Sequence, residues 1–258
     1  MTALVSGADV STAWLAGVTY LLAQPNGEAS NLGVAIADPT AESADLRREL
    51  DAFAEEMSRG GHEVPRIDSV AGTIFPTSFY RPRAADPATH LYDLERRIRA
   101  AVRKHPQNRG GTYFERLVAY PVGNGKTMNQ LHHVTERLRS AARKGRRNGN
   151  QYELSLFHPE RDPYPVGFPC LSHVSLTLTD GKLDATAIYR NQYFVARAYG
   201  NYLGLGEVLR FLAAESGFAA GELLCVASHA KLETATYGRR RVEELVTRCG
   251  ALLERDIA

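Results

Sequence analysis

The chain of 258 residues is 44% hydrophobic and 23% charged, so it can bury a sizeable core and does not have the composition of a disordered protein. Its 31 basic and 29 acidic residues leave a formal net charge of +2, which excludes a protein that binds nucleic acid polymers or membrane surfaces by charge alone. Three cysteines are typical of a reducing compartment and supply neither a disulfide framework nor a zinc site.

A helix is predicted near the start of the chain, capped by Asp9 or Ser11 and ended by Pro25 and Gly27. Its apolar stretch, residues 12–23, is too short to span a bilayer and lacks the basic flank and cleavage pattern of a signal peptide. We therefore expect a cytoplasmic protein that does not enter membranes.

A strand and two further helices follow. Residues 31–37 are typical of a strand, and residues 39–57 of a helix that a glycine pair ends. The apolar face of that helix consists of Leu46, Leu50, Phe53 and Met57. Prolines interrupt residues 73–87, which predicts an irregular surface segment before a helix over residues 91–105.

A hairpin is the clearest local signal of the second half. Residues 172–179 and 183–190 are typical of strands, and the Asp-Gly pair between them favours a tight turn. Cys170 lies just before this hairpin and Arg190 at its far end. Antiparallel pairing of two strands of similar length would therefore bring these two residues together.

The elements on both sides of the hairpin indicate the fold class. Residues 151–157 and 221–229 are typical of strands, and residues 201–217 and 239–256 of helices with one apolar face. Strands and helices thus alternate irregularly along the chain. This pattern predicts an α+β protein built around a mixed or antiparallel sheet.

Several conspicuous residues have simple interpretations. Burial or packing is the role expected for Cys225, Cys249, Gly204 and Gly206. His132 and His133 have no acidic or cysteine partner at metal-ligand spacing, so we expect a surface position and no metal site. Cys170 differs because Pro169 and Gly167 place it in a turn.

Five features of the sequence carry the functional hypothesis. Tyr113 is followed sixteen positions later by Asn129 and then by Gln130. The paired arginines Arg146 and Arg147 come next, in the stretch Gly-Arg-Arg-Asn-Gly.

The remaining features lie further along the chain. Cys170 ends a Phe-Pro-Cys turn, Arg190 follows it by twenty positions, and Asn201 follows Arg190 by eleven. A Gly-Glu-Leu strand then leads to Ala-Ser-His, which ends in His229. Over residues 113–233, about half of the chain, these motifs and spacings resemble the thymidylate synthase family and its relatives that hydroxymethylate pyrimidine nucleotides.

The resemblance implies an architecture. It predicts one thymidylate synthase-like domain over residues 1–258, with a divergent part at 1–105 and the recognisable motifs in 106–258. A mixed sheet packed by helices, and a homodimer formed through that sheet, are implied with it. In the family the arginine pair, here Arg146 and Arg147, is donated across the dimer to bind the phosphate of the partner's substrate.

The resemblance also assigns roles in catalysis. Cys170 would be the nucleophile, because a thiolate that adds to C6 of a pyrimidine makes C5 able to attack a one-carbon electrophile. Arg190 would stabilise the thiolate and contact the substrate phosphate. Asn201 would bind the N3–H and O4 edge of the base, which favours uracil over cytosine. His229 and Tyr113 would organise ordered water and proton transfers.

Positions around the folate site depart from the family pattern. Asn191 and Tyr193 stand where the family has a serine and a pterin-binding aspartate, and Arg197 replaces a glycine. Lys231 replaces a tyrosine that binds the sugar, and the 29 residues after His229 lack the segment that closes over folate. We keep Asn191 and Lys231 as substrate-binding residues, whereas Tyr193 and Arg197 put binding of 5,10-methylenetetrahydrofolate in doubt.

The expected reaction follows from these departures. The family's general-base glutamate is not recognisable, and Glu95 and Glu115 are the candidates to substitute for it. Because methylation needs folate as a hydride donor, we expect hydroxymethylation at C5 of a pyrimidine nucleotide rather than methylation. Two alternatives stay open: a folate-independent cysteine enzyme of nucleotide or natural-product metabolism, and a catalytically inactive homologue that binds a nucleotide.

Overall fold

A seven-stranded mixed sheet forms the centre of the computed structural model, which describes residues 2–164 and 169–257. The strands of this sheet are β1 (Ala3–Asp9), β2 (Glu28–Asp38), β5 (Gly149–Ser155), β6 (Leu171–Thr179), β7 (Lys182–Tyr189), β8 (Gln192–Tyr193) and β9 (Ala219–Lys231). They lie in the order β1-β2-β9-β7-β6-β5, and β8 pairs with β9. A separate small hairpin consists of β3 (Tyr120–Pro121) and β4 (Thr127–Met128).

The α-helices are α1 (Val10–Leu22), α2 (Ala44–Arg59), α3 (Ile67–Ile74), α4 (Pro87–Val102), α5 (Tyr113–Val118), α6 (Gln130–Arg143), α7 (Tyr199–Ser216), α8 (Thr234–Tyr237) and α9 (Arg239–Ile257). Short 3₁₀ turns occur at η1 (Pro25–Gly27), η2 (Thr77–Phe79) and η3 (Pro106–Asn108), and η4 (Phe194–Ala198) is a π-helical turn. Among the described residues, no helix is both long and apolar enough to cross a bilayer.

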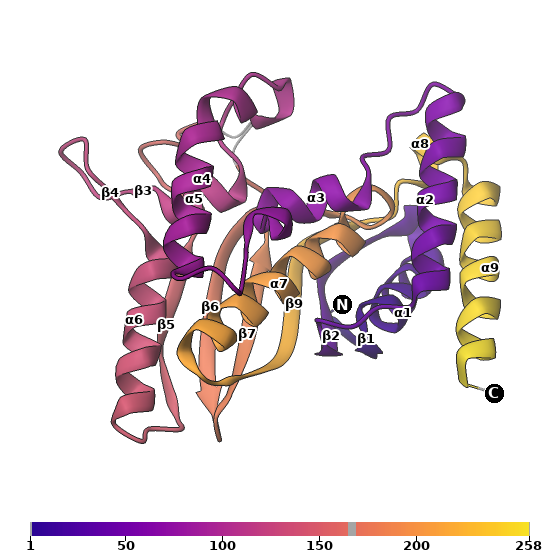
Figure 1. Cartoon of the computed structure of the whole chain (residues 1–258). Helices are drawn as coiled ribbons and strands as arrows, with labels where there is room; N and C mark the ends of the chain where they lie inside the picture. Colours follow the sequence, from indigo (N-terminus) through magenta and orange to yellow (C-terminus); the bar gives the residue numbers. More distant parts are fainter. Residues whose placement is uncertain (1, 165–168, 258) are drawn as a thin grey trace.

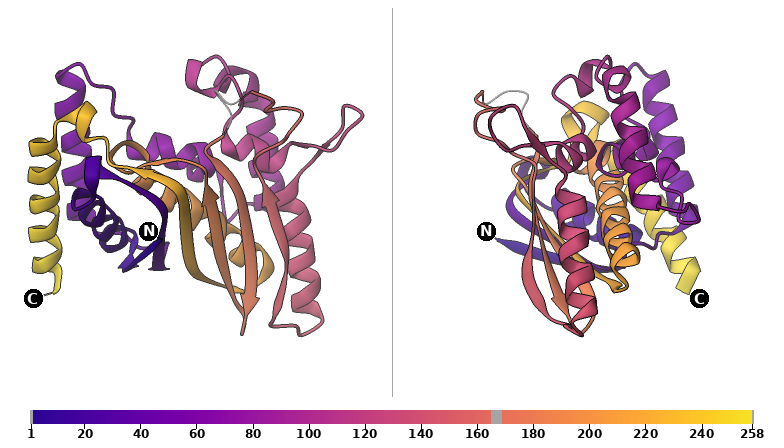
Figure 2. Two further views of the ribbon diagram at one scale, coloured as in Figure 1. Left: turned by 180° about the vertical axis from the view of Figure 1, so that it is seen from behind. Right: turned by 60° about the vertical axis from the view of Figure 1, so that its left-hand side comes forward.

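Helices cover one face of the sheet. α1 packs on β1 and β2, α7 on β7 and β9, and α6 on β5, while α3 lies against α7 (Figure 1). The right-hand view of Figure 2 shows the resulting two layers, with the strands on one side and most helices on the other. On the uncovered face, Ile188 and Leu4 are 42% and 69% exposed. The predicted α+β class, with a mixed sheet packed by helices, is confirmed.

The predicted hairpin of β6 and β7 is confirmed, and it brings Cys170, just before β6, next to Arg190, just after β7. Asp180 and Gly181 have φ angles of 50° and 83°, as a tight two-residue turn between twisted strands requires. β6 and β7 then pair antiparallel from Thr179 opposite Lys182 back to the start of β6. At that end the amide of Arg190 donates to the carbonyl of Cys170 at 2.9 Å.

Close helix packing positions α7 beneath the sheet. A side chain at Gly204 would lie 2.8 Å from the carbonyl oxygen of Ala71 in α3, and one at Gly206 would overlap the carbonyl oxygen of Pro39. Both glycines therefore serve packing, as expected. α7 therefore lies between α3 and the strands β7 and β9.

The helix α1 also supports the region that follows β8. The indole of Trp14 donates to the carbonyl of Phe194 at 2.8 Å, and the ring of Phe194 packs directly over Gly17. The carboxylate of Glu233, which is 5% exposed, accepts hydrogen bonds from the amides of Val195 and Ala196 at 2.9 and 3.1 Å. These contacts fix the π-helical turn that leads into α7.

Candidate functional site

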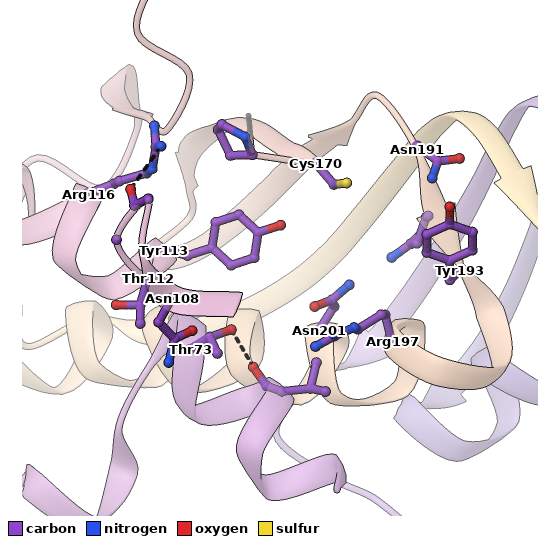
Figure 3. Close-up of a pocket in the computed structure, with 15 residues that line it drawn as sticks. Thr73, Asn108, Thr112, Tyr113, Arg116, Cys170, Asn191, Tyr193, Arg197 and Asn201 are labelled. Carbon is purple, nitrogen blue, oxygen red and sulfur yellow. Dashed lines mark hydrogen bonds between the residues drawn. The ribbon is translucent and has the colours of Figure 1, made fainter. Parts of the chain in front are cut away.

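One cavity of about 310 Å³ lies where the β6–β7 hairpin ends meet α5, η4 and α7. It is lined by Val70, Thr73, Asn108, Gly110, Gly111, Thr112, Tyr113, Arg116, Pro169, Cys170, Asn191, Gln192, Tyr193, Arg197 and Asn201. Figure 3 shows the sulfur of Cys170, the hydroxyl of Tyr113 and the carboxamide of Asn201 facing one space. Residues far apart in the sequence thus meet in a single concave site.

The thiol of Cys170 sits on the wall of this cavity, half-buried just before β6. Burial raises its pKa, whereas the positive charges of Arg190 and Arg197 lower it, and the balance leaves the pKa above its ordinary value. The cysteine is therefore held as a thiol at neutral pH in the absence of a ligand. Gly167, expected to help form the turn before Cys170, lies outside the described residues.

Tyr113 is the first residue of α5, and Thr112 caps this helix by accepting a hydrogen bond from the amide of Glu115 at 3.1 Å. The phenol oxygen accepts from the amide of Leu171 at 3.4 Å, next to Cys170. Burial raises the pKa of the phenol, so Tyr113 stays protonated near neutral pH and can donate to a ligand.

Asn201 approaches the cavity from below, in the first turn of α7. Only 5% of the residue is exposed, and its carboxamide makes no hydrogen bond to any other residue that the structure describes. The carboxamide borders the open cavity, and a ligand there can bind it by offering both a donor and an acceptor. Asn201 is therefore placed where its side chain can form hydrogen bonds with a bound ligand.

Arg190 and Arg197 flank the cysteine from two elements. The Nε of Arg190 donates to the carbonyl of Pro169 at 3.3 Å, which orders the residue immediately before Cys170. Arg197, in the π-helical turn, lines the cavity together with Tyr193, whose side chain is 41% exposed at its mouth. The two arginines act on the thiol electrostatically, but only Arg197 borders the cavity.

His229 lies behind the cavity wall rather than in it. Its Nδ1 is 2.7 Å from Oδ1 of Asn191, a cavity residue, and its Nε2 is 3.4 Å from Oε2 of Glu28 on β2. Lys231, two residues further along β9, forms an ion pair of 2.9 Å with Glu28. His229 therefore contacts the cavity only through Asn191, and Lys231 is connected to His229 only through Glu28 in these contacts.

Arg146 and Arg147 lie at the opposite end of the sheet. The carbonyl of Arg147 accepts from the amide of Gly181 in the β6–β7 turn, and its guanidinium donates to the carbonyl of Asp180. The nine residues of β6 span about 30 Å between this turn and Cys170. The arginine pair therefore does not join the cavity of its own chain.

The two glutamates expected to replace a general base are both in ion pairs. The carboxylate of Glu95 accepts from Arg99 at 2.8 Å and 2.5 Å. Glu115 pairs with Arg103 and Arg161, and these charges hold its pKa below the usual range although burial opposes them. Neither glutamate borders the cavity, so the structure does not bring a carboxylate to the cysteine.

Sequence patterns missed five polar cavity residues: Thr73, Asn108, Thr112, Arg116 and Gln192. Arg116 forms a buried pair with Asp162, at 2.6 and 2.8 Å, that holds the loop between β5 and β6. Gln192 is 2% exposed, and its Nε2 has no hydrogen-bond partner in the described part of the chain. Thr73 and Arg116 lie in helices, and Gln192 lies in the short strand β8. A single polar residue in such an element gives no sequence signal of its own, which is why these positions were not predicted.

Residues outside the cavity take the places expected of them. Cys225 and Cys249 are fully buried, and His132 and His133 are exposed. Among the residues that the structure describes, no group of three or more histidines, cysteines or carboxylates could hold a metal ion.

Comparison of the sequence with models of known protein families found no match, and a comparison with curated proteins found no significant match.

Proposed function

We propose that this chain is a thymidylate synthase-like transferase that forms a covalent adduct between Cys170 and C6 of a pyrimidine nucleotide and modifies C5. The observation that carries the proposal is the cavity in which Cys170, Tyr113, Asn201 and Arg197 meet. These residues come from three separate segments, and three of them, Cys170, Tyr113 and Asn201, were expected together from the motifs. A cavity of about 310 Å³ is within the range that holds a small ligand.

The chemistry that these residues support begins at the sulfur. Cys170 loses its proton and its sulfur bonds to C6, while the electron pair of the C5–C6 double bond moves to C5 and O4. C5 then bonds to the carbon of a donor at the oxidation level of formaldehyde, whose C–O double bond becomes a single bond while its oxygen takes up a proton to give the hydroxymethyl group. Loss of the C5 proton to a base and cleavage of the C6–S bond restore the ring and the thiolate.

Two neighbours favour this addition. A positive charge at Arg197 stabilises both the thiolate and the enolate oxygen, and the protonated Tyr113 can donate to developing negative charge. Asn201 offers an acceptor for N3–H and a donor for O4, which supports uracil as the preferred base.

The cavity does not fit methylenetetrahydrofolate as the one-carbon donor. No carboxylate occurs among the described residues that line it, so the pterin N–H groups would lack their usual partner. Tyr193 and Arg197 also occupy its mouth. We therefore derive no step through folate, and hydroxymethylation with another one-carbon donor is the favoured outcome.

A homodimer formed through the uncovered face of the sheet belongs to the same proposal. Arg146 and Arg147 are too far along the sheet to bind a phosphate in their own cavity, so only a partner chain could use them there. The exposed strand residues Leu4 and Ile188 support a role for this face in association.

A second candidate function has its own support. Because burial raises the pKa of Cys170, the resting protein lacks a preformed thiolate, as would a homologue that binds a nucleotide without reacting. A folate-independent enzyme acting on another heterocycle, such as one of natural-product metabolism, would keep the cysteine and the amides but differ in the partner of Asn201.

Intact mass spectrometry distinguishes these functions. The protein is incubated with uridylate, deoxyuridylate, cytidylate and deoxycytidylate, with and without formaldehyde, and analysed under denaturing conditions. The proposal expects a mass increase of one nucleotide that Cys170→Ala abolishes and Cys249→Ala retains. Binding of a nucleotide without an adduct or a modified product would favour the inactive homologue, and no binding at all would contradict both.

A further inference from the structure

Asn191 connects the cavity to a charged group outside it. The directly opposed positions on β2 and β9 place Glu28 against Lys231 and Ser30 against His229. In this register, Nε2 of His229 lies 3.4 Å from the Glu28 carboxylate, and Nδ1 of His229 lies 2.7 Å from Oδ1 of Asn191. A continuous line of polar contacts therefore runs from the sheet to the cavity wall.

The short contact determines which end of the amide the ligand meets. A carboxamide oxygen can only accept, so the 2.7 Å contact requires the proton on Nδ1 of His229. With its oxygen engaged, Asn191 has only its NH₂ group left to offer. In Figure 3 the Asn191 oxygen points away from Cys170 and Asn201.

The rest of the cavity is also rich in donors. Its charged lining residues are Arg116 and Arg197, and no carboxylate lines it among the described residues. The neighbouring Gln192 is buried and its Nε2 lacks an acceptor within the described part of the chain. An oxygen acceptor of a ligand could satisfy the Nε2 group of Gln192, whereas an amino group of a ligand could not.

We propose that Glu28 and His229 are positioning residues that set which end of the Asn191 amide faces the ligand, so that Asn191 donates to an oxygen of the ligand while Nδ1 of His229 carries a proton. The inference rests on the proposed function in one respect, that the ligand is a pyrimidine nucleoside or nucleotide. The carbonyl, hydroxyl and phosphate oxygens of such a ligand are the acceptors that Asn191 would bind.

The arrangement makes the donor depend on pH. When His229 holds a single proton, the Glu28 carboxylate keeps that proton on Nε2, so Nδ1 becomes an acceptor and the Asn191 amide turns over. The other charged groups facing this pair are Lys231, which binds Glu28, and Tyr193 and Glu233, which act on Lys231. The amide therefore donates to the ligand at acidic pH and presents its oxygen at higher pH.

Binding of uncharged ligands tests this consequence. Uridine and deoxyuridine are used because a phosphate group would itself titrate near pH 6. Their dissociation constants are measured by calorimetry from about pH 5.5 to about pH 8.5, which brackets the titration of histidine. We expect the wild-type affinity to fall roughly tenfold across this range, the effect of one lost hydrogen bond and one unpaired group.

Two variants separate positioning from a structural role. Glu28→Gln should give a flat profile and bind more tightly than wild type at the upper end, because the glutamine NH₂ can donate to Nε2 and leave the proton on Nδ1. Asn191→Asp should bind at least roughly tenfold more weakly throughout, because a carboxylate cannot donate. Glu49→Gln, at a surface ion pair with Arg248, and Asn124→Asp, at an exposed turn, are matched controls that should keep the wild-type profile.

Nitrogen-15 NMR of the ligand-free protein tests the positioning independently of any ligand. The His229 ring is assigned by comparison with His229→Gln, and we expect Nδ1 to be protonated at acidic pH and to lose its proton before Nε2. An unprotonated Nδ1 at acidic pH, or a Glu28→Gln profile identical to wild type, would overturn the inference. If the NMR result holds but no pyrimidine binds, the proposed function fails while the positioning of Asn191 stands.

Discussion

Replacement of Asn201 with aspartate changes a side chain whose carboxamide faces the cavity beside Cys170. The residue is 5% exposed and makes no hydrogen bond to any other described residue, so the substitution breaks no internal contact. An ionised aspartate can only accept, so the O4 oxygen of a bound uracil would lose its donor. The amino group of cytosine would instead gain a charge-assisted acceptor.

The size of the effect follows from the burial of the site. A buried oxygen left without its donor costs about 1–3 kcal/mol, which corresponds to a loss of about 5-fold to 150-fold in affinity for uracil nucleotides. Because cytosine gains a partner, the ratio of the two affinities should change by more than either one alone. We expect preference to move from deoxyuridylate towards deoxycytidylate.

Calorimetric titration of both nucleotides into wild type, Asn201→Asp and the surface control Asn124→Asp measures this ratio. The control should keep the wild-type ratio, since its side chain is exposed at the β3–β4 turn. A ratio in Asn201→Asp that stays within about twofold of wild type would show that Asn201 does not contact the base edge, because such a change is below the value of one hydrogen bond.

Three further predictions concern the dimer, the thiol and the fold. Arg146→Ala should weaken nucleotide binding by about 1.5–3 kcal/mol, and mixing it with Cys170→Ala should restore activity if the arginine acts in the partner's cavity; no recovery would remove that claim. Because burial raises the pKa of Cys170, alkylation by iodoacetamide should be slow at neutral pH and accelerate only above about pH 8.5, and a fast neutral reaction would contradict the burial effect. Asp162→Asn should destabilise the protein by about 3–5 kcal/mol in urea unfolding, since Arg116 would stay buried without its counter-charge, and a change below about 1 kcal/mol would show that the loop relaxes.

Local sequence signals predicted the parts of the site that depend on one hairpin and one helix. The Asp-Gly turn sets the register of most of β6 and β7, and a one-residue register shift between Leu171 and His173 then brings Cys170 and Arg190 into contact. The helix that carries Asn201 was also predicted, but α7 is buried on most of its sides between α3 and the sheet, so the direction of Asn201 depends on that packing.

Other parts depend on contacts that a sequence does not display. β1 and α3 were not predicted because each is a short element that becomes stable only by pairing with β2 or packing on α7. His229 was expected at the substrate, but Glu28, from the other end of the chain, holds it behind Asn191. Such long-range partners appear only once the sheet order is known.

Exchange of the C5 hydrogen of a pyrimidine nucleotide tests the central claim most directly. Addition of Cys170 to C6 makes C5 basic, so the hydrogen there should exchange with solvent even when no one-carbon donor is present. The protein is incubated with deoxyuridylate in deuterium oxide, and loss of the C5 proton signal is followed by NMR. Exchange that requires Cys170 and disappears in Cys170→Ala is the predicted result. Absence of exchange in wild type with deoxyuridylate, uridylate and the two cytosine nucleotides, under conditions where binding is saturated, would contradict covalent catalysis by Cys170.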